Sequence, residues 1–175
     1  MNILVLNGSP KGSNSITLHT VLYLQKKFPG QDFEVLHVGQ KIKSLEKDFS
    51  PALEKLNQAE VLLFSYPVYT FIAPCQLHRF IELMKEHGVD VSGKIATQLT
   101  TSKHFYDVTA HRYIQDNCGD LGLHFIPGLS ADMDDLTTEK GRKEAENWWK
   151  HFLWSAEQGH FAPVYPVSPA TEPVP

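Results

Sequence analysis

A loop of small polar residues follows the first apolar run of the chain. The run Ile3 to Leu6 gives way to residues 7–15, which are Asn-Gly-Ser-Pro-Lys-Gly-Ser-Asn-Ser. Gly8 and Gly12 allow a tight turn and a close approach of the backbone to a ligand. The free N–H groups and the positive dipole end of a following helix would face the same ligand. The loop is therefore predicted to bind a dianion of phosphate size. Its side-chain donors are Ser9, Lys11, Ser13, Asn14 and Ser15.

Other phosphate-binding motifs do not fit this spacing. A Rossmann GxGxxG motif needs a third glycine, and a Walker A motif needs glycine where Ser13 stands. A cysteine phosphatase loop needs Arg six residues after a cysteine, but Ile81 and His124 occupy those positions. The spacing favours a mononucleotide site. The alternative is an ordinary strand–turn–helix junction, which also prefers Gly, Ser and Asn.

Two segments resemble a known family. Residues 7–11 are similar to the opening of the NAD(P)H-dependent FMN reductase and iron–sulfur flavoprotein group, within the flavodoxin-like superfamily. Residues 66–81, Tyr-Pro-Val-Tyr-Thr-Phe-Ile-Ala-Pro-Cys-Gln-Leu-His-Arg-Phe-Ile, resemble its second signature. That signature commonly has Pro-x-Tyr, then a small residue or Pro, then Leu-Lys-x-Phe-Ile. The resemblance extends in outline to about residue 157, and these two motifs are its specific part.

The resemblance implies non-covalently bound FMN, with NAD(P)H as the reductant. The first loop would hold the FMN phosphate through the donors named above. The second loop would lie along the isoalloxazine ring through Pro67, Val68, Tyr69, Thr70 and Phe71. The third loop would reach the polar edge of the ring through Thr100, Thr101, Ser102 and His104, with Phe105 or Tyr106 stacked on it. Apolar walls with a few placed donors suit a flat amphipathic ring, although ordinary packing is the alternative for these aromatic residues.

The function implied is oxidoreduction through bound FMN, from NAD(P)H to a small-molecule or protein acceptor. The flavin would carry the chemistry, so no catalytic side chain is assigned. His104 is a weak candidate for a flavin hydrogen bond or a proton donor, and a solvent-exposed loop histidine is its alternative. Two other functions stay open. One is a flavodoxin-type electron carrier domain of a larger redox protein, and the other is a non-catalytic interaction module with the same fold.

The cysteines set this chain apart from the iron–sulfur members. Residues 39–49 contain no cysteine where those members carry a cluster, so no iron–sulfur centre is expected here. Cys75 and Cys118 form no CxxC pair, which favours a reducing, cytoplasmic compartment. Cys75 is expected to begin a helix as a buried small residue, with a thiolate role as the alternative.

The charge of the chain limits the classes of partner that it is expected to bind. The formal net charge is -4, so no basic surplus is available for nucleic acid. No apolar stretch approaches the roughly 20 residues that span a bilayer, so no membrane partner is expected. Asp132, Asp134 and Asp135 are interpreted as helix N-terminal charges, and no metal is predicted. Asp107 is interpreted as a helix cap and His111 as structural.

Apolar runs and amphipathic segments alternate strictly along the chain. The predicted strands are 3–6, 33–38, 60–65, 94–101 and 124–126. The predicted helices are 13–28, 50–58, 75–87, 107–119 and 137–154. This alternation predicts an α/β fold with a doubly wound, five-stranded parallel sheet between two helical layers. The resemblance adds the flavodoxin-like strand order 2-1-3-4-5.

The end of the chain differs in composition. Residues 1–158 are predicted to form the FMN-binding domain, and 159–175 a Pro-rich tail or linker with five prolines after Phe161. The tail suggests a domain excised from a longer protein. A disordered terminus or a tail that packs on a neighbouring subunit are the alternatives. The resemblance implies a homodimer or higher homo-oligomer, and Trp148 and Trp149 belong either to such an interface or to the core.

Overall fold

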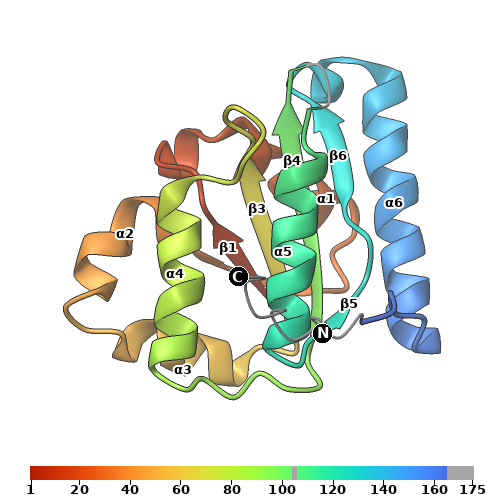
Figure 1. Ribbon diagram of the computed structural model, residues 1–175. Coiled ribbons are helices and arrows are strands. Elements are labelled where there is room, and N and C mark those ends of the chain that lie inside the picture. Colours follow the sequence, from red (N-terminus) through yellow and green to blue (C-terminus); the bar gives the residue numbers. More distant parts are fainter. Residues whose placement is uncertain (104–105, 165–175) are drawn as a thin grey trace, which may run out of the picture.

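Apolar runs of the sequence form parallel strands of one sheet in the computed structural model, which describes residues 1–103 and 106–164 (Figure 1). The hydrogen-bonded order is β2-β1-β3-β4-β5, and β6 also pairs with β4. The strands are β1 Asn2–Asn7, β2 Asp32–Leu36, β3 Val61–Pro67, β4 Ile95–Ser102, β5 His124–Phe125 and β6 Leu129–Asp132. The predicted strand order is confirmed. Strand β3, buried on both faces, lies in the middle of the order, as its unbroken apolar run requires.

Helices cover both faces of the sheet, which gives the three predicted layers (Figure 1). They are α1 Ile16–Lys27, α2 Val38–Leu45, α3 Ser50–Gln58, α4 Cys75–Glu86, α5 Val108–Asp120 and α6 Glu139–Gln158. Alternate residues of β1 enter two cores: Leu4 and Leu6 pack with α2 to α5, while Ile3 and Val5 pack with α1 and α6. Trp149 is fully buried in the second core against Phe33, so core packing is its role. No helix in the described part of the chain has the length and apolar content to cross a membrane.

Helix α2 was not predicted from the sequence. Strand β2 ends at Leu36 instead of Val38, because Val38 is already the first residue of α2. The helix has eight residues, with Val38, Gly39 and Leu45 buried. A helix this short is not stable by itself, so tertiary contacts rather than its sequence pattern must hold it.

The fifth position of the sheet is occupied by two short strands. Strand β5 pairs with Ile95 and Ala96, and β6 pairs with residues 99–102 of the same partner. The prediction contained only the first piece. Pro127 and Gly128 interrupt the run between the two pieces, and β6 carries the polar residues Ser130 and Asp132. A strand that is only half buried gives no apolar run to recognise.

Several predicted element boundaries also differ. A short 3-10 turn, Gly12–Asn14, precedes α1, which starts at Ile16 after the Ser15 cap instead of at residue 13. Asp107 occupies the N-cap position of α5, but its side chain does not cap the helix, so the helix-cap interpretation is wrong. Cys75 begins α4 as expected, yet it is exposed rather than buried.

Helix α6 ends later than predicted, and the segment after it packs on the sheet. The helix reaches Gln158, and Gly159 ends it in a left-handed conformation with φ 69°. Ala162 then donates its backbone N–H to Phe125 O at 2.7 Å, so the start of the predicted tail packs beside β5. Residues 165–175 of that tail lie outside the described part of the chain.

Lys94 joins the end of α3 to the start of β4. Its Nζ donates to the carbonyls of Leu56, Asn57 and Ala59 at 2.8, 2.8 and 2.6 Å. These carbonyls lack helical partners, and a cation favours this end of a helix dipole. Replacing Lys94 with Met keeps the aliphatic stem and removes the donors, so we expect a loss of about 1–2 kcal/mol in the free energy of unfolding, measured by urea denaturation. Lys26→Met, at an exposed position of α1, is the control; equal stability of the two variants would contradict this role.

Candidate functional site

The loop after β1 is held in shape by the side chain of Asn7, which is fully buried. Its Nδ2 donates to Gly12 O at 3.0 Å, and its Oδ1 accepts the Ser9 N–H at 3.2 Å. Nδ2 also lies 3.1 Å from Nδ1 of His37, just before α2. Because an amide nitrogen only donates, His37 Nδ1 is the acceptor in this pair. One side chain thus fixes two points of the loop and the start of α2.

Two serine side chains hold the rest of the loop and the start of α1. Ser9 is buried, and its Oγ accepts the Lys11 N–H at 3.2 Å. Ser15 caps α1 by accepting the Leu18 N–H at 3.4 Å. Gly12 has φ 56°, a left-handed conformation that favours glycine. This is the strand–loop–helix arrangement that binds phosphate groups at a helix N-terminus.

Helix α2 packs directly against this loop through Gly39. A Cβ atom at Gly39 would lie 2.3 Å from Ser9 O and 2.7 Å from Gly8 O. The backbones of α2 and of the loop are therefore in contact, and α2 serves as an outer support. Because the sequence did not predict α2, Gly39 gave no signal of this contact.

A cavity of about 290 Å³ opens where the loop meets the carboxyl ends of β3 and β4. Its lining residues are Ser9, Lys11, Ser15, Ile16, Thr17, Pro67, Val68, Tyr69, Thr70, Thr101, Lys103 and Met133. In open α/β sheets, ligands bind outside the carboxyl ends of the strands where the strand order reverses. Here the order reverses between β1 and β3, so the cavity stands at that position.

The cavity brings together much of the predicted site. All three predicted segments reach it: the phosphate loop, residues 67–70 and Thr101. Predicted residues that do not line it are Ser13, Asn14, Phe71, Thr100 and Ser102. His104 and Phe105 lie outside the described residues. Sequence reasoning missed Ile16, Thr17, Lys103 and Met133. Lys103 lies between the predicted residues Ser102 and His104, and Ile16 and Thr17 directly follow the first loop. Met133 stands among Asp132, Asp134 and Asp135, which were interpreted only as helix N-terminal charges.

The cavity has cationic and hydroxyl groups for an anionic ligand. Within the described part of the chain, Lys11 is exposed and its side chain has no hydrogen bond or ion pair, and Lys103 Nζ lies 3.7 Å from Asp134 Oδ2. Thr17 Oγ1 and Thr101 Oγ1 are hydrogen-bonded at 2.6 Å between α1 and β4. These groups fit a ligand that carries a phosphate and a ring with polar atoms, and FMN is such a ligand.

A hairpin turn forms the rim of the cavity. Tyr69 and Ile72 exchange both backbone hydrogen bonds, at 3.0 and 3.2 Å, around the two-residue turn Thr70-Phe71. Both turn residues have positive φ, 48° and 72°. Glycine or asparagine is usual there, because a β-branched or bulky side chain is strained in this region. Strain of this kind persists at binding sites where the surroundings impose it.

We expect replacement of Thr70 with Asn to relieve this strain. Asn enters the left-handed region several-fold more often than a β-branched residue, so the free energy of unfolding should rise by about 1 kcal/mol. The measurement is urea denaturation of the ligand-free protein. A variant less stable than the original would show that the Thr70 side chain contributes more in the rim than its backbone strain costs.

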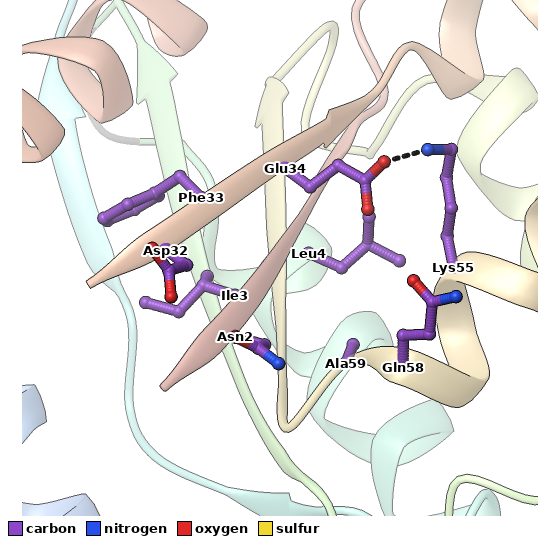
Figure 2. A pocket seen from close by; sticks show the side chains of 9 residues that line it. All are labelled: Asn2, Ile3, Leu4, Asp32, Phe33, Glu34, Lys55, Gln58 and Ala59. Atoms are coloured by element: carbon purple, nitrogen blue, oxygen red, sulfur yellow. Dashed lines mark hydrogen bonds and ion pairs between the residues drawn. The ribbon is translucent and has the colours of Figure 1, made fainter.

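A second cavity, of about 270 Å³, lies at the opposite edge of the sheet. Figure 2 shows it between the amino ends of β1 and β2 and helix α3, with the Glu34 carboxylate bonded to Lys55 Nζ. That cation is already neutralised, and in the described part of the chain no helix N-terminus or phosphate-type loop lines the cavity. It lacks the features of an anion site, which leaves the carboxyl edge as the candidate.

The acidic residues after β6 bond within their own loop. Asp132 N–H donates to Asp135 Oδ2 at 2.8 Å, and Asp134 N–H donates to Asp132 Oδ1 at 3.0 Å. These carboxylates therefore organise the turn before α6. In the described ranges 1–103 and 106–164, no group of three or more His, Cys, Asp or Glu side chains could hold a metal ion.

Comparisons with known proteins agree with this geometry. The family model described as NADPH-dependent FMN reductase matches residues 1–131. A search of curated proteins found no match. Among solved structures, the apo form of an NADH:FMN oxidoreductase called EMOB is similar, with a TM-score of 0.70, 18% identity, and coverage of 88% of this chain and 89% of that chain.

Two further structures share the fold. An FMN-dependent NADH-azoreductase from Bacillus anthracis, in complex with FMN, has a TM-score of 0.62 and 12% identity over 90% of this chain and 99% of that chain. A flavodoxin from the domain Archaea has a TM-score of 0.63 and 13% identity over the same shares, 90% and 99%. At these identities the likeness shows a flavodoxin-like fold.

Proposed function

Because the chain belongs to the family of NADPH-dependent FMN reductases, we propose that it passes hydride or electrons from NAD(P)H through bound FMN to a second substrate. Membership gives the cofactor, FMN, and the nicotinamide reductant. The observation that carries the proposal is the carboxyl-edge cavity, where the Asn7-organised loop, residues 67–70 and Thr101 converge. The acceptor would be a small molecule or a protein.

The residues of the first loop would hold the FMN phosphate. Ser9 and Ser15 place hydroxyls at the loop, Lys11 supplies a cation, and the start of α1 supplies free N–H groups. Burial of Ser9 and Ser15 fixes their side chains before a ligand arrives, so little ordering is needed on binding.

The residues of the second and third segments would hold the ring. Pro67 to Thr70 form one wall and Thr101 and Lys103 stand at the other side. Bound FMN would accept electrons from reduced nicotinamide and supply them to the acceptor. The chain itself would orient the ring, and the apolar wall would keep water from it. No side chain in the described cavity is required as an acid or base.

The test is a visible absorption spectrum of the purified protein, before and after incubation with FMN and desalting. Retained flavin bands, released as FMN on denaturation, are expected, followed by steady-state oxidation of NADPH or NADH with a quinone or dye. A retained, reducible flavin without turnover would instead favour the electron carrier. Protein that stays colourless would overturn the proposal in favour of a non-catalytic module.

Two sequence-based expectations accompany this proposal as predictions. One is a homodimer or higher homo-oligomer, which light scattering of the FMN-loaded protein would test. Large exposed apolar side chains in and next to the rim turn support it: Tyr69, Phe71, Ile72 and Tyr106, whose ring packs against Phe71. The other is a cytoplasmic location, which rests on the separate, unpaired cysteines.

A further inference from the structure

Consecutive threonines at the end of β4 are fixed from opposite faces of the sheet. Thr101 lines the cavity and bonds to Thr17 of α1. Thr100 faces α5, where its Oγ1 lies 2.8 Å from His111 Nε2 and donates to Asp107 Oδ2 at 3.3 Å. Thr100 is fully buried, so these partners and the Leu129 carbonyl, at 3.4 Å, replace water. The strand end is thus held between α1 and α5.

Asp107 is the centre of the network on the α5 face. Only 6% of this residue is exposed. Besides Thr100, the Ser130 hydroxyl of β6 donates to its Oδ2, and His111 Nε2 lies 3.4 Å from the same oxygen. The carboxylate has turned away from the helix amides that it was expected to cap. It instead joins β4, α5 and β6.

The positions of the protons follow from the partners. The Asp107 carboxylate and the Leu129 carbonyl can only accept, so the single proton of the Thr100 hydroxyl goes to one of these oxygens, and His111 Nε2 then donates to the hydroxyl. Burial lowers the pKa of His111 below its usual value, and the Asp107 charge opposes part of that shift. Neutral His111 with its proton on Nε2 completes the network without a buried unpaired group.

The network reaches the cavity wall through the sheet. Tyr66 pairs with Thr100 and Pro67 with Thr101 in the β3–β4 register. Val68 then donates its N–H to Thr101 O at 3.0 Å. Any displacement of the Thr100–Thr101 peptide therefore moves Pro67 and Val68 as well. Both sides of the cavity wall depend on the same strand end.

We propose that Thr100, Asp107, His111 and Ser130 are positioning residues of the cavity: they hold the carboxyl end of β4 so that Thr101 and Val68 stand where the ring of FMN binds. The positions of Thr101 and Val68 can be tested without any ligand, whereas the effect on FMN rests on the proposed function.

The experiment compares three substitutions on β4. Thr100→Val keeps the branched shape and removes the hydroxyl, and Thr100→Ser restores the hydroxyl. The control is Thr97→Val, since Thr97 is equally buried on the same strand but its Oγ1 has no partner among the described residues. The readouts are hydrogen exchange of the Val68 amide in FMN-free protein and the FMN dissociation constant from fluorescence quenching. Unfolding in urea is measured for each variant.

We expect Thr100→Val to speed Val68 exchange and to raise the FMN dissociation constant by about ten-fold each, because the variant lacks the buried hydroxyl that bonds to both Asp107 and His111. Thr100→Ser should stay within about three-fold of the original protein, and Thr97→Val should match it. If Thr100→Val does not fold, Ser130→Ala, which removes one donor to Asp107, is expected to give the same pattern at smaller size.

Three results decide between the possibilities. Unchanged Val68 exchange in the Thr100→Val variant would overturn the inference, and so would failure of Thr100→Ser to rescue, since shape alone would then matter. If Val68 exchange responds as expected but no variant binds FMN, including the original chain, the proposed function falls and the positioning role stands.

Discussion

Replacing Asn7 with Asp should raise the FMN dissociation constant about 100-fold or more. The substitution keeps the size of the side chain but removes both Nδ2 hydrogens, which now go to Gly12 O and His37 Nδ1. A carboxylate would face the Gly12 carbonyl oxygen, which would lose its donor, and His37 could bond to the carboxylate only by carrying a proton on Nδ1. Each such mismatch at a buried site costs about 1–3 kcal/mol. The new negative charge would also stand under the loop that is proposed to receive the phosphate dianion, where repulsion adds to the loss.

The measurement is a fluorescence titration of FMN at fixed ionic strength, with a thermal unfolding curve of the FMN-free variant. Asn147→Asp, at an exposed position of α6, adds the same charge far from the cavity and should leave FMN affinity unchanged within about two-fold. Equal affinity of the two variants would show that Asn7 does not organise the loop. Loss of folding in Asn7→Asp would be followed with Asn7→Ser, a smaller change that retains a donor.

The role of Asn7 shows which part of this site can be predicted from the sequence. The loop could be predicted because its residue types suit phosphate binding, so Ser9, Lys11 and Ser15 were predicted and line the cavity. Asn7 was part of the same loop, yet its role depends on a buried geometry that connects residues 5 and 30 positions apart. Such a role is set by the fold rather than by spacing.

The parallel sheet was predictable from the residues, whereas its strand order came from the family resemblance. Unbroken apolar runs such as 61–64 identify buried parallel strands, and alternation with helices leaves few topologies. Strand β6 and helix α2 were missed because each is short and stabilised by contacts from elsewhere in the chain. Asp107 was interpreted as a cap from its position in the sequence. Its side chain instead accepts hydrogen bonds from the hydroxyls of Thr100 on β4 and Ser130 on β6.

Helix α2 leads to the second large expected effect. Replacing Gly39 with Ala should lower the FMN affinity by about 100-fold and the free energy of unfolding by about 1–3 kcal/mol. The new methyl group would lie 2.3 Å from Ser9 O and 2.4 Å from Ser9 C. These are backbone atoms, so no side-chain rotation can make room. Either α2 moves outward and releases His37 from Asn7, or the loop moves inward and closes its phosphate position.

The matched control is Gly30→Ala, in the exposed turn between α1 and β2, where a Cβ would meet nothing within 4 Å. It should leave FMN affinity unchanged and stability within about 0.5 kcal/mol. Comparing the two substitutions separates a general effect of removing glycine from the specific contact of α2 with the loop. If Gly39→Ala loses stability but binds FMN normally, α2 supports the fold alone. If it keeps stability and loses FMN, the contact exists to set the shape of the phosphate loop, and the short unpredicted helix belongs to the binding site.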